Sequence, residues 1–242
     1  MAEPRVIATA SDDFVSAAAD LIAERIQRAA GPRCRLVLAG GGTPRPVYEA
    51  LAKRSDLDWS RVDFLWGDER AVGPDDAKSN YRMAKEALLD PIGAVDGQVF
   101  RIEGERAAAE AAAAYASTVQ GLQLDLVLLG MGGDGHTASM FPGDPPSRDE
   151  ASDVVVTTSP VPPTTRISMS LRALNAAAHV VFLVTGAGKA ARLAEVWRQR
   201  DTADPVLPAA MINPSPGELV WMLDHAAAAQ LPIANPANET KQ

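Results

Sequence analysis

The chain has 242 residues, of which 47% are hydrophobic and 22% are charged, and its formal net charge is −8. A chain of this length can bury roughly three quarters of its unfolded surface, and the composition excludes the disordered, fibrous and disulfide-rich classes. The negative charge argues against a general binder of nucleic acid or anionic membranes, because such binding needs a basic surface. We therefore expect one folded domain over residues 1–242, with a frayed tail at 232–242.

The single cysteine, Cys34, precedes an apolar run and is expected to be a buried thiol in a reducing compartment. The N-terminal sequence has no basic flank followed by an apolar core, and no later stretch approaches about 18 apolar residues. These features predict a cytoplasmic protein without a membrane partner. They leave the oligomeric state open, and a monomer is compatible with them.

Short runs rich in Val, Leu and Ile alternate with longer segments of helical period. This pattern predicts an α/β fold with a mainly parallel sheet and crossover helices. An alanine-rich segment, 105–120, is predicted to be a helix, and a proline cluster predicts an exposed loop over 141–153. The expected strands are Arg5–Ala8, Arg35–Ala39, Val62–Trp66, Leu124–Leu129, Val154–Thr157, Arg166–Ser170, Val180–Thr185 and Glu218–Asp224.

A glycine-rich turn follows the second predicted strand, in RLVLAGGGTPRPVYEAL. Gly40, Gly41 and Gly42 let backbone amides approach a ligand, while Thr43 suits a helix N-cap and Pro44 suits the first helical position. A strand, a glycine turn and a helix N-terminus together form an anion site. The spacing matches neither the dinucleotide fingerprint nor the Walker A loop, so a plain tight turn is an equal alternative.

The third predicted strand ends at a run of charges, Asp68, Glu69 and Arg70. At the shared sheet edge, the acid can orient a histidine and the arginine can hold a carboxylate or a phosphate. A solvated loop is the alternative interpretation of such a run.

The segment LDLVLLGMGGDGHTASMFPG places four glycines and then His136 after a buried-type strand. Ligands of open α/β sheets bind at the carboxyl ends of the strands, and imidazole suits proton transfer near neutral pH. We therefore predict that His136 is a general base. The alternative is a histidine that only caps or packs.

A third glycine turn, in VVFLVTGAGKAARLAEV, brings Lys189 to the start of a helix. A cation at a helix N-terminus opposes the dipole unless an anion is shared between them, so Lys189 is predicted to bind an anion. A lysine that points into solvent is the alternative. Arg166 begins a further strand after a proline-rich turn, and the sequence leaves its exposure open.

The sequence offers little support for metal or covalent chemistry. His179 and His225 are scattered, and the chain has neither an HExxH motif nor a G-x-S-x-G elbow. We therefore predict no cofactor, no dedicated metal site and a water molecule as the nucleophile.

Four segments, AGGGTPRPVYEAL, GDERAVGPDDAKSNYRMAKEALL, GMGGDGHTASMFPG and TGAGKA, resemble in order and spacing the 6-phosphogluconolactonase family. The resemblance runs from about Val6 to about Asp224. It implies a mainly parallel sheet with helices on both faces, as in sugar-phosphate isomerases and deaminases. It also implies hydrolysis of 6-phospho-D-glucono-1,5-lactone to 6-phospho-D-gluconate in the oxidative pentose phosphate pathway, with this small phosphorylated lactone as the partner.

The same resemblance assigns roles to individual residues. It puts His136 in the position of the general base, with Asp68 as the acid beside it, and Asp134 and Gly135 as supports of the histidine loop. Six residues fall where the family contacts substrate and phosphate: Gly41, Gly42, Thr43, Arg70, Arg166 and Lys189. The role of Arg70, at the phosphate or at the oxyanion, stays open.

The sequence departs from the family pattern in two places. The first loop reads AGGGTP where SGGSTP is usual, and Gly133 stands where proline or glutamate is usual. These departures bear on a hydroxyl contact and on the stiffness of the histidine loop.

Two other functions fit parts of the pattern. A glucosamine-6-phosphate deaminase shares the first loop and the Asp-Gly-His, but its second motif typically continues GHIAFNEPGS, whereas this chain reads GHTASMFPG. A non-catalytic sugar-phosphate sensor shares the fold, but such regulators usually carry a basic helix-turn-helix, whereas this chain is acidic and its strands begin near Arg5.

Overall fold

The computed structural model describes residues 3–144 and 151–232. Its main feature is a seven-stranded parallel sheet with the strand order β1-β10-β9-β6-β2-β3-β5. In that order the strands span Arg5–Thr9, Glu218–Asp224, His179–Val184, Leu126–Leu129, Cys34–Leu38, Val62–Trp66 and Val99–Phe100. The parallel α/β architecture predicted from the alternating pattern is confirmed. Strand β5, with only two residues, is too short for a periodic signal and was not expected.

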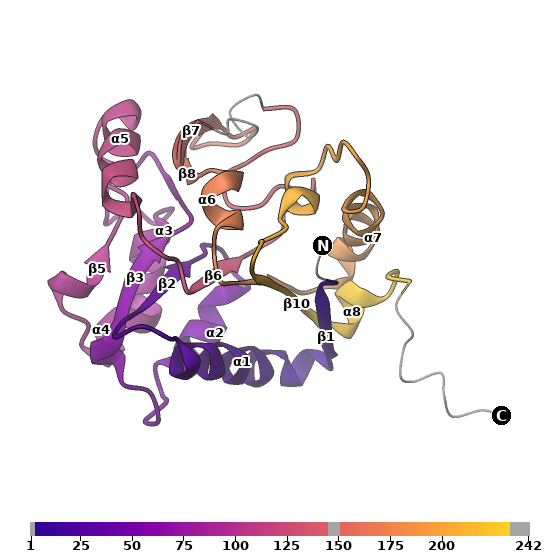
Figure 1. Ribbon diagram of the computed structural model, residues 1–242, viewed down its shortest axis with the longest axis horizontal. Coiled ribbons are helices and arrows are strands. Elements are labelled where there is room, and N and C mark those ends of the chain that lie inside the picture. Colours follow the sequence, from indigo (N-terminus) through magenta and orange to yellow (C-terminus); the bar gives the residue numbers. More distant parts are fainter. Residues whose placement is uncertain (1–2, 145–150, 233–242) are drawn as a thin grey trace.

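Helices cover both faces of this sheet (Figure 1). In that view α1 and α2 lie below the sheet, while α5 and α6 lie above it. Parallel strands need such crossover connections, because a tight turn joins only antiparallel strands. The helices are α1 (Phe14–Arg28), α2 (Pro44–Leu51), α3 (Asn80–Ala84), α4 (Asp90–Ile92), α5 (Ala108–Val119), α6 (Leu171–Asn175), α7 (Ala190–Gln199) and α8 (His225–Ala228).

A second sheet of three antiparallel strands lies above the first (Figure 1), in the order β4 (Asp68–Arg70), β8 (Thr165–Met169) and β7 (Val154–Thr158). The sequence identified β7 and β8 as strands but not this separate antiparallel sheet. A short run rich in β-branched residues has the same pattern in either kind of pairing, so its partners are set by tertiary contacts. The charged run 68–70, expected at the sheet edge with a solvated loop as the alternative, pairs as the edge strand of the second sheet.

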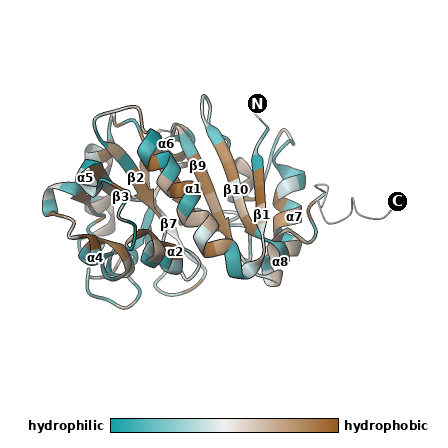
Figure 2. Cartoon of the chain, turned by 90° about the horizontal axis from the view of Figure 1, so that it is seen from below, coloured by the Kyte–Doolittle hydropathy of each residue, from teal (hydrophilic) through white to brown (hydrophobic). Residues whose placement is uncertain are grey.

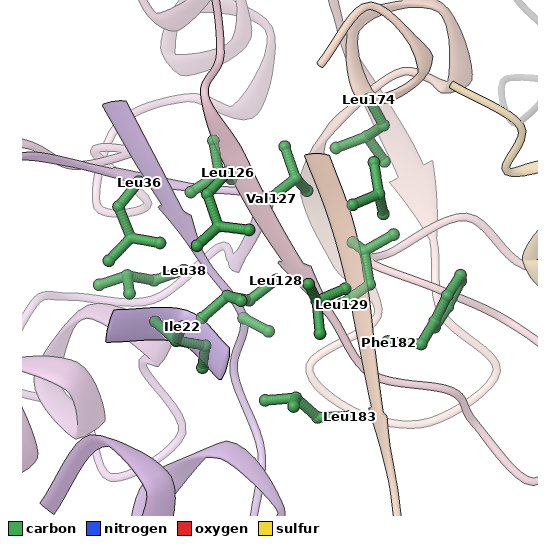
Figure 3. Packing of buried hydrophobic residues seen from close by; sticks show 14 of the residues in the cluster. Ile22, Leu36, Leu38, Leu126, Val127, Leu128, Leu129, Leu174, Phe182 and Leu183 are labelled. Carbon is green, nitrogen blue, oxygen red and sulfur yellow. The ribbon is translucent and has the colours of Figure 1, made fainter. Parts of the chain in front are cut away.

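The central strands of the parallel sheet are buried on both faces, as their continuous apolar runs require. Figure 3 shows Leu36 and Leu38 of β2 packing beside the leucines of β6, with Phe182 of β9 across the sheet. Figure 2 shows the middle of β9, β10 and β1 in brown, beside helices with teal outer residues. Cys34 at the start of β2 is a free, buried thiol, as predicted, and burial raises its pKa to about 12.

Several other expectations concern single segments. The alanine-rich helix is confirmed as α5. In the predicted loop at 141–153, the structure describes 141–144 and 151–153, and 145–150 lie outside the described residues; Phe141 at its start is buried. The predicted frayed tail lies, from residue 233 on, outside them as well. Among the described helices, none has the length and apolarity needed to cross a membrane.

Candidate active site

A cleft of about 340 Å³ opens at the carboxyl ends of four adjacent strands, β9, β6, β2 and β3. Along the chain, β2 is followed by β3, its neighbour on one side, and later by β6, its neighbour on the other side. The cleft therefore lies at the point where the strand order reverses. This is where ligands of open α/β sheets bind. The first two glycine turns predicted from the sequence line it, the third contributes Lys189, and Asp68, Arg70 and His136 line it as well.

The first glycine turn begins directly after strand β2, at a residue whose backbone is hydrogen-bonded to a tyrosine hydroxyl. The buried hydroxyl of Tyr48 accepts the N–H of Ala39 and donates to its carbonyl, both at 2.9 Å, so these backbone groups need no further ladder partner. Gly41 has a φ of +104°, a conformation that favours glycine. Thr43 does not cap α2 as expected: its backbone is already helical, and its hydroxyl lies 3.3 Å from that of Thr185, the residue after β9.

A second tyrosine hydroxyl is hydrogen-bonded in the same way to the last residue of β3. The hydroxyl of Tyr115 accepts the N–H of Trp66 at 2.8 Å and donates to its carbonyl at 2.9 Å. Both tyrosines are buried, and burial raises the pKa of each. The strands beside the cleft therefore stop at defined residues, so the turn that carries Gly41 and the strand that begins at Asp68 start from fixed points.

The second turn holds His136. Its Nδ1 lies 2.6 Å from Oδ1 of Asp134, and its carbonyl accepts the N–H of Gly132 at 2.8 Å. A Cβ on Gly132 would come within 2.1 Å of the imidazole, and Gly135 has a φ of +87°, so both positions require glycine. The ring of Phe141 packs against the imidazole with 4.8 Å between centroids. The histidine is thus fixed in place by its own loop.

The partner of Nδ1 determines which nitrogen of His136 carries the proton. An ionised carboxylate only accepts hydrogen bonds, so Nδ1 is the donor and Nε2 of the neutral ring keeps its lone pair. Partial burial of Asp134 opposes its ionisation, but the hydrogen bonds from His136, together with the charge of that ring when it is protonated, outweigh this and lower the pKa of Asp134. In the part of the chain that the structure describes, Nε2 makes no hydrogen bond. It is available to take a proton.

Asp68 lines the same cleft but does not orient His136, and this corrects the expectation from sequence. Its carboxylate, 7% exposed, accepts the hydroxyl of Ser139 on Oδ2 and the amide of Asn80 on Oδ1. The orienting contact comes from Asp134 because a Gly separates Asp134 from His136 and lets the chain turn back on itself. Asp68 instead provides a fixed negative charge in the cleft.

The third turn places Lys189 at the end of a short 3-10 turn, Ala187–Lys189, just before α7. Its Nζ donates to the carbonyl of Met131 in the second turn at 2.9 Å, so the side chain points into the cleft instead of into solvent. Gly186, with a φ of +94°, donates its N–H to the buried carboxylate of Asp224 at 3.0 Å. The third turn is therefore anchored at Asp224 and reaches the second through Lys189.

The two arginines lie next to each other on the second sheet, where Arg70 of β4 pairs with Arg166 of β8. Arg70 lines the cleft and donates to the carbonyl of Lys78, whereas Arg166 lies behind it, 6% exposed, with a hydrogen bond to Ser159. Burial and the charge of Arg70 lower the pKa of Arg166. Within residues 3–144 and 151–232, neither Nε atom has a hydrogen-bond partner. Two neighbouring cations with free donors favour an anion.

The structure also brings to the site two residues that the sequence did not single out, Asn80 and Ser139, and gives a place to Glu69, which was named without a role. All three lie around Asp68 and are buried. The SNYR segment after β4 was quoted only as part of a motif, because a polar pair at a helix start is typical of simple capping. In the described ranges no group of three His, Cys, Asp or Glu side chains could hold a metal ion.

Comparison with known proteins shows which family the chain belongs to. A family model described as glucosamine-6-phosphate isomerases/6-phosphogluconolactonase matches residues 9–221. The chain belongs to this family of sugar-phosphate enzymes.

Among its curated relatives, the 6-phosphogluconolactonase of Nostoc sp. is 36% identical over 232 residues, covering 91% of this chain and 95% of that protein. The human 6-phosphogluconolactonase is 37% identical over 241 residues, covering 93% and 92%.

Solved structures of the same family have the same fold. The 6-phosphogluconolactonase of Thermotoga maritima superposes with a TM-score of 0.83 at 31% identity, covering 92% of this chain and all of that one. The 6-phosphogluconolactonase of Trypanosoma brucei superposes with a TM-score of 0.84 at 30% identity, covering 95% and 99%. A monomeric glucosamine-6-phosphate deaminase, 21% identical with a TM-score of 0.82, shares the fold alone.

Proposed function

We propose that this chain is a 6-phosphogluconolactonase, which hydrolyses 6-phospho-D-glucono-1,5-lactone to 6-phospho-D-gluconate in the oxidative pentose phosphate pathway. The observation that carries the proposal is the pairing of His136 with Asp134 at 2.6 Å in a cleft that is also lined by Lys189 and Arg70. A base and cations within one cleft suit a phosphorylated ester. The named relatives, similar over nearly the whole chain, support the same activity.

In the proposed reaction, Nε2 of His136 takes a proton from a water molecule as its oxygen attacks the lactone carbonyl. Asp134, hydrogen-bonded to Nδ1, stabilises the imidazolium that forms, and the negative charge of Asp68 in the same cleft favours it as well. The tetrahedral intermediate then collapses, the bond from the carbonyl carbon to the ring oxygen breaks, and the imidazolium returns its proton to that oxygen. A general base of this kind accelerates the step about 10²- to 10⁴-fold.

The phosphate is the proposed handle that brings the ester to the base. Thr43, the turn amides of Gly41 and Gly42, and Lys189 line the cleft, as does Arg70, with Arg166 behind it. Binding energy from the phosphate, remote from the carbonyl, would orient the ester toward His136. Arg70 would hold either the phosphate or the developing oxyanion.

Assays of the purified chain with two substrates test the proposal. Acid release from freshly generated 6-phosphogluconolactone, above the spontaneous opening of the lactone, is expected. Ammonia release from glucosamine 6-phosphate is not expected, since the histidine loop reads GHTASMFPG. Ammonia release without lactone hydrolysis would assign the chain to the deaminases, and tight sugar-phosphate binding without turnover would make it a sensor.

The same proposal places the enzyme in the cytoplasm, where it binds neither nucleic acid nor membrane. The net charge of −8 and the buried free thiol of Cys34 support this.

A further inference from the structure

Asn80, the first residue of α3, lies between Asp68 and the first glycine turn. Its side chain lines the cleft although the residue is only 2% exposed. We propose that Asn80 is a positioning residue for lactone hydrolysis: it holds the carboxylate of Asp68 in the cleft and keeps it at a fixed distance from Gly40. This inference rests on the proposed function.

The surroundings of Asn80 fix the orientation of its amide group. Nδ2 lies 2.9 Å from the carbonyl oxygen and 3.2 Å from Oδ1 of Asp68. Both atoms only accept hydrogen bonds, so the NH₂ group must face Asp68 and the amide oxygen must face the other way. A carboxylate inside the cleft is thus held by a donor that is aimed at it.

The opposite side of the amide packs against the first glycine turn. A Cβ on Gly40 would lie 1.8 Å from Oδ1 and 2.7 Å from Nδ2 of Asn80. Gly40 has no left-handed backbone to explain the absence of a side chain; the space is occupied by Asn80. The asparagine therefore sets the distance between the first turn and Asp68.

The backbone of Asn80 is anchored by a buried carboxylate, Glu69, which is 2% exposed. It accepts the N–H groups of Asn80 and Tyr81, each at 2.8 Å, and the hydroxyl of Ser79 at 2.9 Å. Burial raises the pKa of Glu69, while these donors oppose the shift. Because Glu69 follows Asp68 directly in β4, one short strand carries both the charge and the anchor of the residue that orients it.

One atom of the network is left without a partner. Within the described residues, Oδ1 of Asn80 is buried and accepts no hydrogen bond. An unsatisfied buried oxygen costs free energy, and native proteins retain such costs mainly at functional sites. Together with Ser139 on Oδ2, the amide holds Asp68 by both carboxylate oxygens. Loosening one side should change the chemical step and leave phosphate binding intact.

A double-mutant cycle in lactone hydrolysis tests the inference, with Asn80→Ala, Asp68→Asn and the two combined. We expect Asn80→Ala to lower kcat about tenfold with KM within about twofold, since one hydrogen bond to a charged group is lost. In the Asp68→Asn background it should lower kcat less than about twofold further, because residues in one network are not additive. Thermal unfolding of each variant reports that the fold is intact. If Asn80→Ala does not fold, Asn80→Leu removes the donor at a similar volume without adding a charge and enters the same cycle.

Other outcomes overturn the inference. Losses in kcat that multiply would mean that Asn80 does not act through Asp68. A tenfold rise in KM in both backgrounds would mean that Asn80 binds substrate directly. If the unmodified chain does not hydrolyse the lactone above background, the proposed function fails; an active chain with multiplying losses rejects the role of Asn80 alone.

Gly40 provides an independent check. Gly40→Ala should lower kcat in the unmodified chain but cost little more in the Asn80→Ala background, where its methyl group has room. Gly73→Ala, at a position with open space and no contact with the cleft, is the matched control and should change neither constant. Equal losses from Gly40→Ala in both backgrounds would contradict the coupling.

Discussion

Oδ1 of Asp134 accepts two hydrogen bonds from the same residue: Nδ1 of His136 at 2.6 Å and the backbone N–H of His136 at 3.1 Å. The acid and the base are separated by one glycine, so the orientation of the imidazole is set within a single tight turn. The charge that stabilises an imidazolium thus lies in the histidine loop itself and does not depend on the approach of another strand.

Asp134→Asn tests this relationship kinetically. An asparagine can keep the turn but supplies no charge for the imidazolium, so kcat should fall by about 10²-fold or more, while KM for the phosphorylated lactone changes little. Steady-state kinetics at neutral pH measure both constants. A variant with unchanged kcat would show that Asp134 only shapes the loop.

The pKa of Asp134, lowered by its contacts with His136 in spite of partial burial, predicts a pH-dependent contribution to stability. A depressed folded-state pKa stabilises the protein above the unfolded value, near 3.8, and this contribution is lost as the pH falls through the lower folded value. Urea unfolding of the unmodified chain and of Asp134→Asn should therefore show a difference near pH 6 that shrinks below about pH 4. A difference that does not change with pH would reject the linkage.

Lys189 bridges two of the turns that line the cleft and is the proposed phosphate ligand. Lys189→Met should raise KM for 6-phosphogluconolactone about 10- to 100-fold, the equivalent of one hydrogen bond to a charged group, with a smaller change in kcat. Glucono-1,5-lactone, which lacks the phosphate, is the control substrate, and its hydrolysis should be affected much less. Equal losses on both lactones would place Lys189 at the carbonyl end.

The tyrosine hydroxyls that are hydrogen-bonded to the ends of β2 and β3 are predicted to stabilise the fold without taking part in catalysis. Tyr48→Phe leaves the N–H and carbonyl of Ala39 unsatisfied and should cost about 1–3 kcal/mol in urea unfolding. Tyr115→Phe should cost a similar amount through Trp66. Tyr81→Phe is the matched control, because the Tyr81 hydroxyl makes no hydrogen bond in the described part of the chain, and its change should stay within about 0.5 kcal/mol. A loss of stability for Tyr48→Phe as small as that of the control would show that the Tyr48 hydroxyl does not stabilise the end of β2.

Much of the fold follows from local pattern. The apolar runs at 35–39, 62–66 and 180–185 predicted strands that the structure places within a residue of those bounds, because strands buried on both faces have no polar face to obscure the signal. The antiparallel pairing of β4 with β8 was not predictable in the same way. It depends on which surfaces meet after the parallel sheet has formed, and a three-residue strand of charged residues carries no periodicity.

The site was predicted in part, for a related reason. The glycine turns identified the edge of the sheet and brought Thr43, His136 and Lys189 to one cleft. The role of orienting the histidine was assigned to Asp68 instead of Asp134. Asp134 lies two residues before His136, and this spacing is typical of an Asx turn. Asn80 was missed because its partners, Asp68 and Gly40, are 12 and 40 residues away in the sequence.

The most direct test of the account compares the unmodified chain with His136→Gln on freshly generated 6-phosphogluconolactone, with the spontaneous opening subtracted. We predict that kcat falls about 10²- to 10⁴-fold while KM is nearly retained, because the base is removed and the phosphate ligands are not. His225→Gln, an exposed histidine outside the cleft lining, is the matched control and should behave as the unmodified chain does. Full turnover by a folded His136→Gln variant would contradict the central claim that this imidazole is the base.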